Sequence, residues 1–249
     1  MYKGLRVGAV IPARDEAGNI ATVVTELADL HTTGQGRIVD EIVVCDNGST
    51  DGTGERACTA GAHVVRQPTP GYGIACLTAL AALGPVDVVL FVDGDRSCRI
   101  HQATGLLDAI TGGADMAVGS RALGTMERGA LSPAQIAGNR VASILIRVLW
   151  GRRVTDLGPF RAIRATALRR LEMCDTAYGW TVEMQVKAIR ENLRVVETPV
   201  DSLRRHSGRS KVGGTIPGIV GASTGILGTI FRLRFNRPQT AAKRGKPRA

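Results

Sequence analysis

A chain of 249 residues is long enough to bury one large α/β core. Its formal net charge of +10 and its pI near 10.0 imply an anionic partner, such as nucleic acid, membrane phospholipid or a phosphorylated substrate. Aromatic residues make up only 4% of the chain, which leaves few stacking platforms for single-stranded nucleic acid, and five widely spaced cysteines indicate reduced thiols rather than a disulfide framework.

Two strands are predicted in the first 45 residues, and each runs into a polar loop. The apolar run at 5–11 predicts a buried strand that ends at Pro12, and apolar residues at helical spacing predict a helix over 20–30. No Gly-X-Gly-X-X-Gly follows the first strand, which argues against a dinucleotide-binding oxidoreductase. The second strand, at 41–45, ends in Asp46.

The polar string after Asp46 predicts the start of another helix. Ser49 or Thr50 is expected to cap this helix, and Asp51 is expected to favour its first turn, because a helix N-terminus is electropositive. Capping accounts for these three residues but leaves Asp46 itself unexplained.

Strands and helices continue to alternate up to an acidic pair. A third strand is predicted over 62–66, a helix follows Gly73, and a fourth strand over 86–92 ends in Asp93 and Asp95, which one glycine separates. The alternation predicts an α/β fold with a mostly parallel sheet and right-handed crossovers. The acids at the strand ends therefore converge on the edge where α/β sheets bind ligands.

Asp93 and Asp95 are badly placed to be ionised together unless a cation lies between them. Hard oxygen ligands suit Mg²⁺ or Mn²⁺, so we predict a divalent-metal site that handles a diphosphate. The alternative is a polar turn, because clusters of acids and glycine after strands are common for that reason alone.

The second half is predicted to hold helices over 136–150 and 181–189 and a strand over 193–200. The first of these helices is amphipathic and is followed closely by Arg152 and Arg153. It either covers the core or lies at a membrane surface.

The segment 212–231 carries no charged residue, but six glycines and Pro217 make it only modestly hydrophobic. We predict an amphipathic helix at the membrane interface rather than a full span, and the alternative is a helix docked on its own domain. Small residues four apart, such as Gly221 and Gly225, would let this helix pack against a partner in a homo-oligomer. The basic tail that follows is expected to be disordered and to favour anionic lipid.

Several strings of residues, taken in their order, resemble the nucleotide-sugar glycosyltransferases of family two, which have the GT-A fold. These strings are Val10 to Glu16, Val43 to Thr53, Asp93-Gly94-Asp95 and Gly119-Ser120-Arg121. Three later strings are similar to the branch of polyprenyl-phosphate and dolichyl-phosphate mannose synthases and polyprenyl-phosphate glucosyltransferases. They are Asp156 to Arg161, Tyr178 to Gln185 and Arg205 to Lys211.

The resemblance covers about Arg6 to Gly214 and implies a Rossmann-like, mostly parallel sheet flanked by helices. With the C-terminal patterns it predicts a GT-A domain over 1–211, an amphipathic helix over 212–235 and a disordered basic tail over 236–249. A nucleotide-sugar donor, with Mg²⁺ or Mn²⁺ as cofactor, is the implied partner.

The resemblance also implies roles for individual residues. Donor-binding roles fall on Pro12, Ala13, Glu16, Asp46, Asp93, Gly94, Asp95, Arg121, Arg205 and Lys211. Among these, Asp93 and Asp95 match the metal-binding pair, Asp46 matches an acid that binds the base or ribose, and Arg205 and Lys211 match a loop that closes over the phosphates. Tyr72 stands where many relatives carry a lysine, which puts a phosphate contact there in doubt, and Ser97 stands where many carry a glutamine.

The acceptor decides whether a general base is needed. A sugar hydroxyl would need a carboxylate to take its proton, and Glu183 is the first candidate and Asp156 the second. A polyprenyl phosphate is already ionised at neutral pH and needs cations instead, for which Arg161 is the candidate. The structural alternatives to these two roles are that Glu183 stabilises the first turn of a helix through the helix dipole, and that Arg161 forms an ion pair.

The leading interpretation is an inverting, metal-dependent hexosyltransferase that acts on polyprenyl phosphate. It would lie peripherally on the cytoplasmic, inner face of the cell membrane, attracted by anionic lipid, and would bind no nucleic acid. One alternative transfers to a soluble or lipid hydroxyl. Another is a basic nucleic-acid-binding protein, which would leave the acids at the strand ends unexplained.

Overall fold

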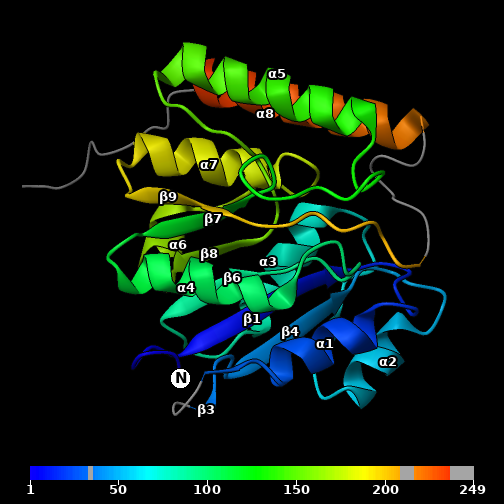
Figure 1. Cartoon of the computed structure of the whole chain (residues 1–249). Helices are drawn as coiled ribbons and strands as arrows, with labels where there is room; N and C mark the ends of the chain where they lie inside the picture. The colour runs from blue at the N-terminus through cyan, green and yellow to red at the C-terminus, as the bar shows by residue number, and fades with distance from the viewer. Residues whose placement is uncertain (33–35, 208–215, 236–249) are drawn as a thin grey trace, which may run out of the picture.

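The computed structural model describes residues 1–32, 36–207 and 216–235 (Figure 1). Lys211, the start of the predicted C-terminal helix at 212–215 and the tail at 236–249 lie outside these residues. Within the described chain the larger sheet has seven strands in the order β5-β4-β1-β6-β8-β7-β9. These strands are β1 (Val7–Ala13), β4 (Glu41–Asp46), β5 (His63–Arg66), β6 (Val88–Phe91), β7 (Met116–Ser120), β8 (Arg161–Arg164) and β9 (Val195–Pro199). A small two-stranded sheet pairs β2 (His31–Thr32) with β3 (Gly36–Arg37).

All neighbours in the larger sheet are parallel except β8, which runs antiparallel to both β6 and β7. The helices between the strands are α1 (Ile20–Ala28), α2 (Thr53–Thr59), α3 (Tyr72–Ala82), the 3₁₀ turn η1 (Ile100–Gln102), α4 (Ala103–Thr111), α5 (Pro133–Trp150), α6 (Ala165–Leu171), α7 (Trp180–Arg190) and α8 (Ile216–Phe235). The predicted mostly parallel sheet flanked by helices, with a helix at its C-terminal end, is therefore confirmed.

Both faces of the sheet are buried, which explains why its central strands are apolar at nearly every position. Along β6, Val88 and Leu90 pack with α1 and α4 on one face, while Val89 and Phe91 pack with α3 and α7 on the other. Phe91 meets Trp180 edge to face at 6.1 Å between ring centroids. The strand that carries the acidic pair is thus fixed from both sides.

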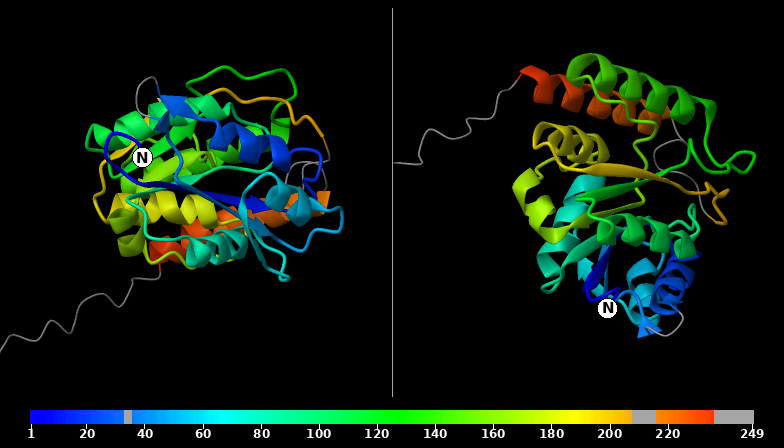
Figure 2. Two further views of the ribbon diagram at one scale, coloured as in Figure 1. Left: turned by 90° about the horizontal axis from the view of Figure 1, so that it is seen from below. Right: turned by 60° about the vertical axis from the view of Figure 1, so that its left-hand side comes forward.

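An outer layer made of α5 and α8 lies over α7 (Figure 1; Figure 2, right). The apolar contact between this layer and α7 is made by Ile146 of α5, Val182 and Val186 of α7, and Ile230 of α8. Helix α5 begins three residues earlier than predicted because Ser132, Pro133 and Gln135 form an N-terminal capping box with proline in the first turn, a pattern that the apolar spacing does not reveal.

The C-terminal helix is docked on its own domain at its described side chains, as the alternative interpretation predicted. Ile230 is fully buried against α5 and α7. Gly221 faces the ring of Tyr178, and Gly225 faces its Cβ atom. None of the helices in the described chain is long and apolar enough to cross a membrane.

The first strand does not end at Pro12 as predicted, but continues to Ala13. The oxygen of Val10 accepts from Val92 on the β6 side, and the oxygen of Ala13 accepts from Asn47 on the β4 side. Because these sides alternate along a strand, Pro12 turns its missing N–H toward the side where β6 has already ended. Proline therefore costs the sheet no hydrogen bond at this position.

Candidate active site

Two polar loops, after β1 and after β4, are joined by their own side chains. Ser49 accepts from the backbone N–H of Asp15 at 3.0 Å, and Asp15 accepts from the N–H of Thr50 at 3.0 Å. Neither Ser49 nor Thr50 caps α2, contrary to our expectation. Asp51 binds the N–H of Thr53 instead, at 3.1 Å. The polar residues after β4 therefore join the loops that follow β1 and β4, and Ser49 and Thr50 do not cap α2.

Asp46 and Asn47 lie at the end of β4, and both are buried. Asp46 accepts from the N–H of Ser49 at 2.9 Å and lines a cavity of about 610 Å³. The other lining residues come from the loop after β4, the start of α2, the end of β5 and the loop after β5, among them Gly48, Glu55, Arg66 and Pro68. This cavity lies where the carboxyl ends of adjacent parallel strands meet, and it is large enough for a nucleoside.

Asp93 and Asp95 follow β6 at the same edge of the sheet. The glycine between them, Gly94, is packed so closely that an added Cβ would lie 3.2 Å from Ile20 and 3.4 Å from Ala13. Burial, and then the charge of Asp95, raise the pKa of Asp93 to about 7. The two carboxylates therefore resist being ionised together unless a positive charge is close by.

Arg205 supplies a positive charge at this place and joins two of the loops. Its guanidinium donates to Glu16 at 2.6 Å and to Asp95 at 2.8 Å. Glu16 is buried, and it also accepts from Asn19 at 2.8 Å. Burial raises the pKa of Glu16 even though Arg205 and Asn19 oppose that shift. Glu16, Asp95 and Arg205, three of the residues predicted to bind the nucleotide-sugar donor, are thus in direct contact.

Arg121 is held by Asp156 in a bidentate ion pair. Its Nε and Nη2 atoms both lie 2.7 Å from the carboxylate oxygens, and its backbone N–H adds a bond of 2.8 Å. Asp156 is buried, which alone would raise its pKa, but the bonds from Arg121 outweigh burial and hold the pKa below its usual value. The pair fixes the direction of the Arg121 side chain.

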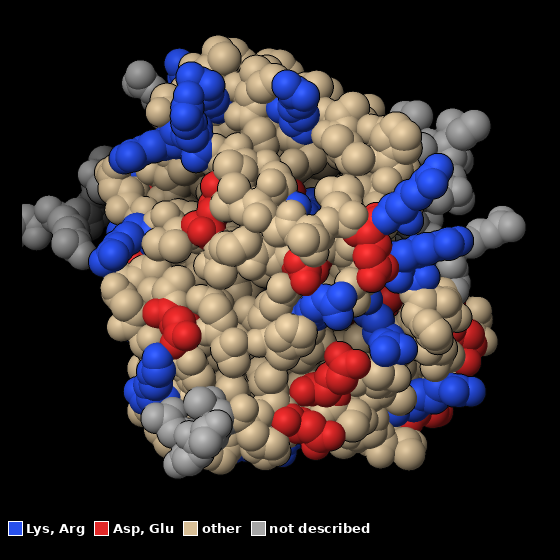
Figure 3. Space-filling view, viewed as in Figure 1, with Lys and Arg blue, Asp and Glu red and all other residues tan. Residues whose placement is uncertain are grey.

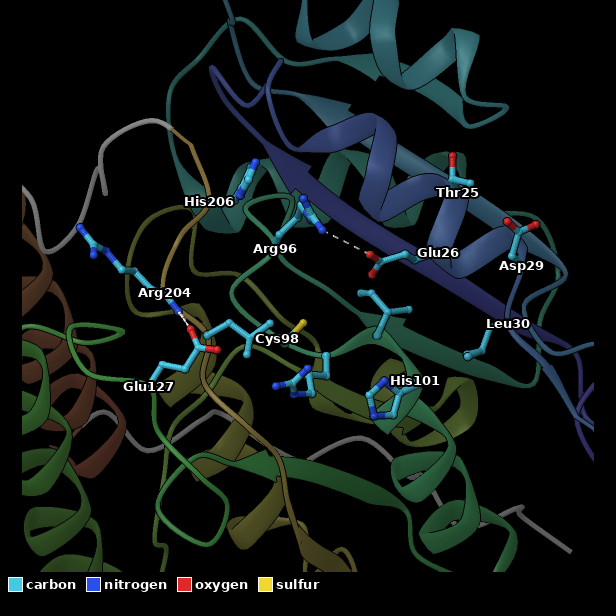
Figure 4. Close-up of a pocket in the computed structure, with 13 residues that line it drawn as sticks. Thr25, Glu26, Asp29, Leu30, Arg96, Cys98, His101, Glu127, Arg204 and His206 are labelled. Atoms are coloured by element: carbon cyan, nitrogen blue, oxygen red, sulfur yellow. Dashed lines mark hydrogen bonds and ion pairs between the residues drawn. The ribbon is translucent and has the colours of Figure 1, made fainter.

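A second cavity, of about 580 Å³, lies against residues next to Asp95 and Arg205 in the chain (Figure 4). Its lining includes Arg96, which points toward Glu26, and Arg204, whose side chain extends away from Glu127 (Figure 4). The Arg96 guanidinium lies 3.6 Å from Glu26, and the backbone N–H of Arg204 donates to Glu127 at 2.8 Å. The charge of this cavity is therefore mixed.

Comparison with known families identifies the family of the chain. Residues 9–172, about two thirds of the chain, match the model of glycosyl transferase family 2. The chain belongs to this family. It is a nucleotide-sugar glycosyltransferase, and its expected GT-A fold is shared with solved structures.

Three similar proteins illustrate the range of this family. Glycosyltransferase AglJ of Haloferax volcanii is 31% identical over 198 residues, which are 79% of this chain and 63% of AglJ. The undecaprenyl-phosphate mannosyltransferase of Micrococcus luteus is 30% identical over 228 residues, with 86% of this chain and 90% of that protein covered. The glucosyl-3-phosphoglycerate synthase of Mycobacterium tuberculosis, solved with Mn²⁺, UDP and phosphoglyceric acid, has a TM-score of 0.74 at 21% identity, with 95% of this chain and 81% of that chain covered.

The residues of this glycosyltransferase fit a divalent cation at Asp93 and Asp95. Within the described residues, no group of three or more histidine, cysteine or acidic side chains could hold a metal by itself. Two carboxylates are nevertheless the protein ligands that Mg²⁺ commonly takes, with water and substrate phosphates completing its shell. The half-buried, mutually repelling pair is a donor set of this kind.

The two candidate bases are both engaged in structural bonds. Glu183 is fully buried and accepts from the backbone N–H groups of Cys174 and Asp175 and from Lys187 at 2.9 Å. Burial would raise its pKa, but a hydrogen bond from the Cys174 thiol at 2.9 Å, together with these bonds, outweighs burial and holds the pKa below its usual value. We therefore interpret Glu183 as the residue that ties α7 to the preceding loop, and Asp156 as the partner of Arg121.

Arg161 lies inside the fold rather than on an acceptor surface. Its side chain is 1% exposed and donates to the carbonyl oxygens of Gly158 and Thr181. Burial lowers its pKa to about 10. Within the described residues backbone carbonyls take the place of a carboxylate partner, and the predicted contact with an acceptor phosphate has no exposed guanidinium to support it.

Sequence reasoning missed two residues of the site. Asn47 binds the N–H of Gly71 at 2.8 Å, and so ties the loop after β4 to the start of α3. Tyr72 donates its hydroxyl proton to Asp93 at 2.9 Å. The position of Asn47 directly after Asp46 was a usable signal, whereas nothing in the sequence around Tyr72 indicates a contact with a residue 21 positions away.

Proposed function

We propose that this glycosyltransferase transfers a hexose, with inversion, from GDP-mannose or UDP-glucose to a polyprenyl phosphate at a membrane surface, with Mg²⁺ or Mn²⁺ as cofactor. One observation carries the donor side of the proposal. Arg205 bridges Glu16 and Asp95 at the sheet edge where Asp93 and Asp46 also lie. The cavity beside Asp46 would take the base and ribose of a nucleoside diphosphate sugar, and the acidic pair with Arg205 would take its diphosphate.

The residues of this edge have separate tasks in the proposed reaction. Asp46 and its cavity bind the nucleoside. Pro12 and Ala13 end β1, where Ala13 pairs with Asp46, and with Glu16 they face the part of the donor outside that cavity. Asp93 and Asp95 hold the cation, which when bound stabilises the negative charge that gathers on the departing diphosphate. Arg205 and Arg121 donate N–H groups to the same oxygens, and Lys211, outside the described residues, is proposed to join them.

The bonding of Glu183 and Asp156 supports a phosphate acceptor. Both carboxylates are buried and fully engaged, and both have lowered pKa values, so neither is suited to take a proton at neutral pH. A phosphate monoester needs no such base because it is already ionised. The similarity to an undecaprenyl-phosphate mannosyltransferase over 86% of the chain supports the same choice.

The outer face of α5 supports a location at a membrane. Ile136, Val141, Ile144 and Val148 are between 46% and 74% exposed. Arginines accompany them on this helix, which contains no acidic residue, and the surface over α5 in Figure 3 is tan and blue without red. An exposed apolar stripe flanked only by cations suits an anionic lipid surface.

An acceptor panel tests the proposal. The protein is incubated with Mn²⁺, radiolabelled GDP-mannose or UDP-glucose, and one of three acceptors in detergent: a polyprenyl phosphate, the corresponding polyprenol, or phosphoglyceric acid. We expect labelled product with the polyprenyl phosphate, and none with Asp95→Ala. Product with the polyprenol or phosphoglyceric acid alone would contradict the proposed acceptor while keeping the enzyme a glycosyltransferase.

A further inference from the structure

The two acids of the proposed metal site are held by different kinds of partner. Asp95 accepts from Arg205 and from the N–H of Ser97 at 3.0 Å. Asp93 accepts from Tyr72 through Oδ1 at 2.9 Å. Within the described residues, Tyr72 is the only hydrogen-bond partner of Asp93. One neutral hydroxyl therefore decides the orientation of the more buried carboxylate.

Tyr72 is the first residue of α3, and the start of that helix is fixed by a neighbouring loop. No side chain caps α3. Instead the N–H of Gly73 donates to Ala177 at 3.1 Å, and the N–H of Ile74 donates to Thr176 at 2.9 Å. A Cβ on Gly71 or Gly73 would collide with the backbone of this loop. The helix start therefore sits directly on the 174–179 loop, and Tyr72 has little freedom to move away from Asp93.

The 174–179 loop is itself held at several points. Asp175 accepts from the N–H groups of Ala177 and Gly179 through one oxygen, at 2.9 and 3.1 Å. Its other oxygen accepts from Thr229 at 3.0 Å and from Arg232 at 3.2 Å, both on α8. The position of Tyr72 thus depends on bonds that reach from the acidic pair to the outer helix layer.

We propose that Tyr72 is a positioning residue for the proposed metal site: its hydroxyl holds Oδ1 of Asp93 so that the other carboxylate oxygen is directed to the cation. Hydrogen bonds from outside a metal's ligand shell act in this way, because they fix the rotamer of the ligand. The inference rests on the proposed function, since it needs Asp93 and Asp95 to bind a divalent ion.

Metal affinity measured without turnover tests the proposal. Free Mn²⁺ is titrated by electron paramagnetic resonance in the presence of GDP or UDP, for the wild type and for Tyr72→Phe. Loss of a bond of this class typically weakens metal binding by about 10- to 100-fold, so we expect the Mn²⁺ Kd of Tyr72→Phe to rise about 10-fold or more. A Kd within twofold of the wild type would overturn the proposal.

A matched control separates positioning from a general loosening of α3. Leu80 lies further along the same helix and packs against the core, so Leu80→Ala loosens α3 without touching Asp93 or the nucleoside cavity. We expect its Mn²⁺ Kd to match the wild type. An equal loss of affinity in Leu80→Ala would overturn the positioning role. Tyr72→Met, which also lacks the hydroxyl but keeps a flexible side chain of similar reach, repeats the test should the phenylalanine variant fail to fold.

Asp95→Ala distinguishes failure of this inference from failure of the proposed function. Weak Mn²⁺ binding in Asp95→Ala together with normal binding in Tyr72→Phe would overturn the role of Tyr72 and keep the metal site. Wild-type affinity in Asp95→Ala would overturn both, because the cation would then bind elsewhere.

Discussion

Arg205 comes from the segment after β9, yet two of its three N–H-bearing nitrogens contact acids that follow β1 and β6. A guanidinium can do this because its donors form a rigid, planar fork, whereas a lysine ammonium is a single point charge. Its side chain is 19% exposed, so the ion pairs are only partly screened by water. The residue therefore stabilises the site, and in the proposed reaction it is the group that contacts the diphosphate.

Arg205→Ala is expected to lower kcat/KM by about 100-fold or more, because one preorganised donor to a developing negative charge is typically worth this much. Arg205→Lys should recover part of the loss, since it restores the charge but not the fork. Steady-state kinetics at saturating Mn²⁺ measures both. Activity of the alanine variant within threefold of the wild type would remove Arg205 from the proposed chemistry.

The placement of a residue could be predicted where the residue follows the end of a strand. It could not be predicted where burial depends on an element far away in the sequence. Asp46, Asp93 and Asp95 could be placed at one edge because parallel strands bring their carboxyl ends together. Arg161 was given an acceptor role because the sequence does not show that it begins a buried antiparallel strand. Tyr72 could not be paired with Asp93 without the fold.

At the scale of elements, Glu183 fastens α7 to the loop before it. The carboxylate lies in the first turn of α7 and accepts from two backbone N–H groups of that loop as well as from Lys187. A buried acid with this many donors is stabilising only while it is ionised. The same bonds that hold its pKa down make the fastening pH-dependent.

Glu183→Gln is expected to lower the free energy of unfolding by about 1.5–3 kcal/mol at pH 7, the usual contribution of hydrogen bonds to a charged group. Because the folded-state pKa lies below the unfolded value of about 4.3, this stabilisation is present above pH 4.3 and is lost as pH falls through the folded pKa. Urea denaturation of both proteins between pH 7 and pH 3 measures the difference.

The same variant separates a structural role from a catalytic one. A folded Glu183→Gln protein should keep kcat within a few-fold of the wild type, whereas loss of a general base typically costs 100-fold or more. A fall in kcat of that size with an unchanged melting temperature would show instead that Glu183 acts as a general base.

The element that sequence patterns missed most clearly is β8. This four-residue strand has arginines at both ends, Arg161 and Arg164, so it shows neither an apolar run nor an alternation. Their guanidinium groups are satisfied by backbone carbonyls of Gly158, Thr181, Ala114 and Ile110. Only the assembled sheet provides these acceptors, which is why the antiparallel strand in an otherwise parallel order could not be foreseen.

At the scale of the whole molecule, the two helices α5 and α8 add a layer that the sheet does not need for its own burial (Figure 2). Helix α5 turns Ala142 and Ile146 inward, and leaves Ile144 and Val148 more than half exposed on its outer face. The proposed contact with lipid uses this outer face, and the inner face of α8 is already occupied by its own domain.

Ile144→Glu is expected to reduce co-sedimentation with vesicles that contain anionic phospholipid by several-fold, because a charge in the apolar stripe opposes insertion. Thr59→Glu places the same charge on α2, far from α5 in Figure 1, and should bind vesicles almost like the wild type. Equal binding by both variants would show that the outer face of α5 does not contact the membrane.

The central claim is that Asp93 and Asp95 hold a divalent ion that binds the diphosphate of a nucleotide sugar. A thermal-shift titration of the wild type and Asp95→Ala, with GDP- and UDP-sugars in the presence and absence of Mn²⁺, tests it most directly. A donor at a hundred times its Kd adds about 2.7 kcal/mol, which corresponds to a rise in Tm of about 5–10 °C for a protein of this size. We predict such a rise for one nucleotide, dependent on Mn²⁺ and lost in Asp95→Ala; equal rises in both proteins, or none in either, would contradict the account.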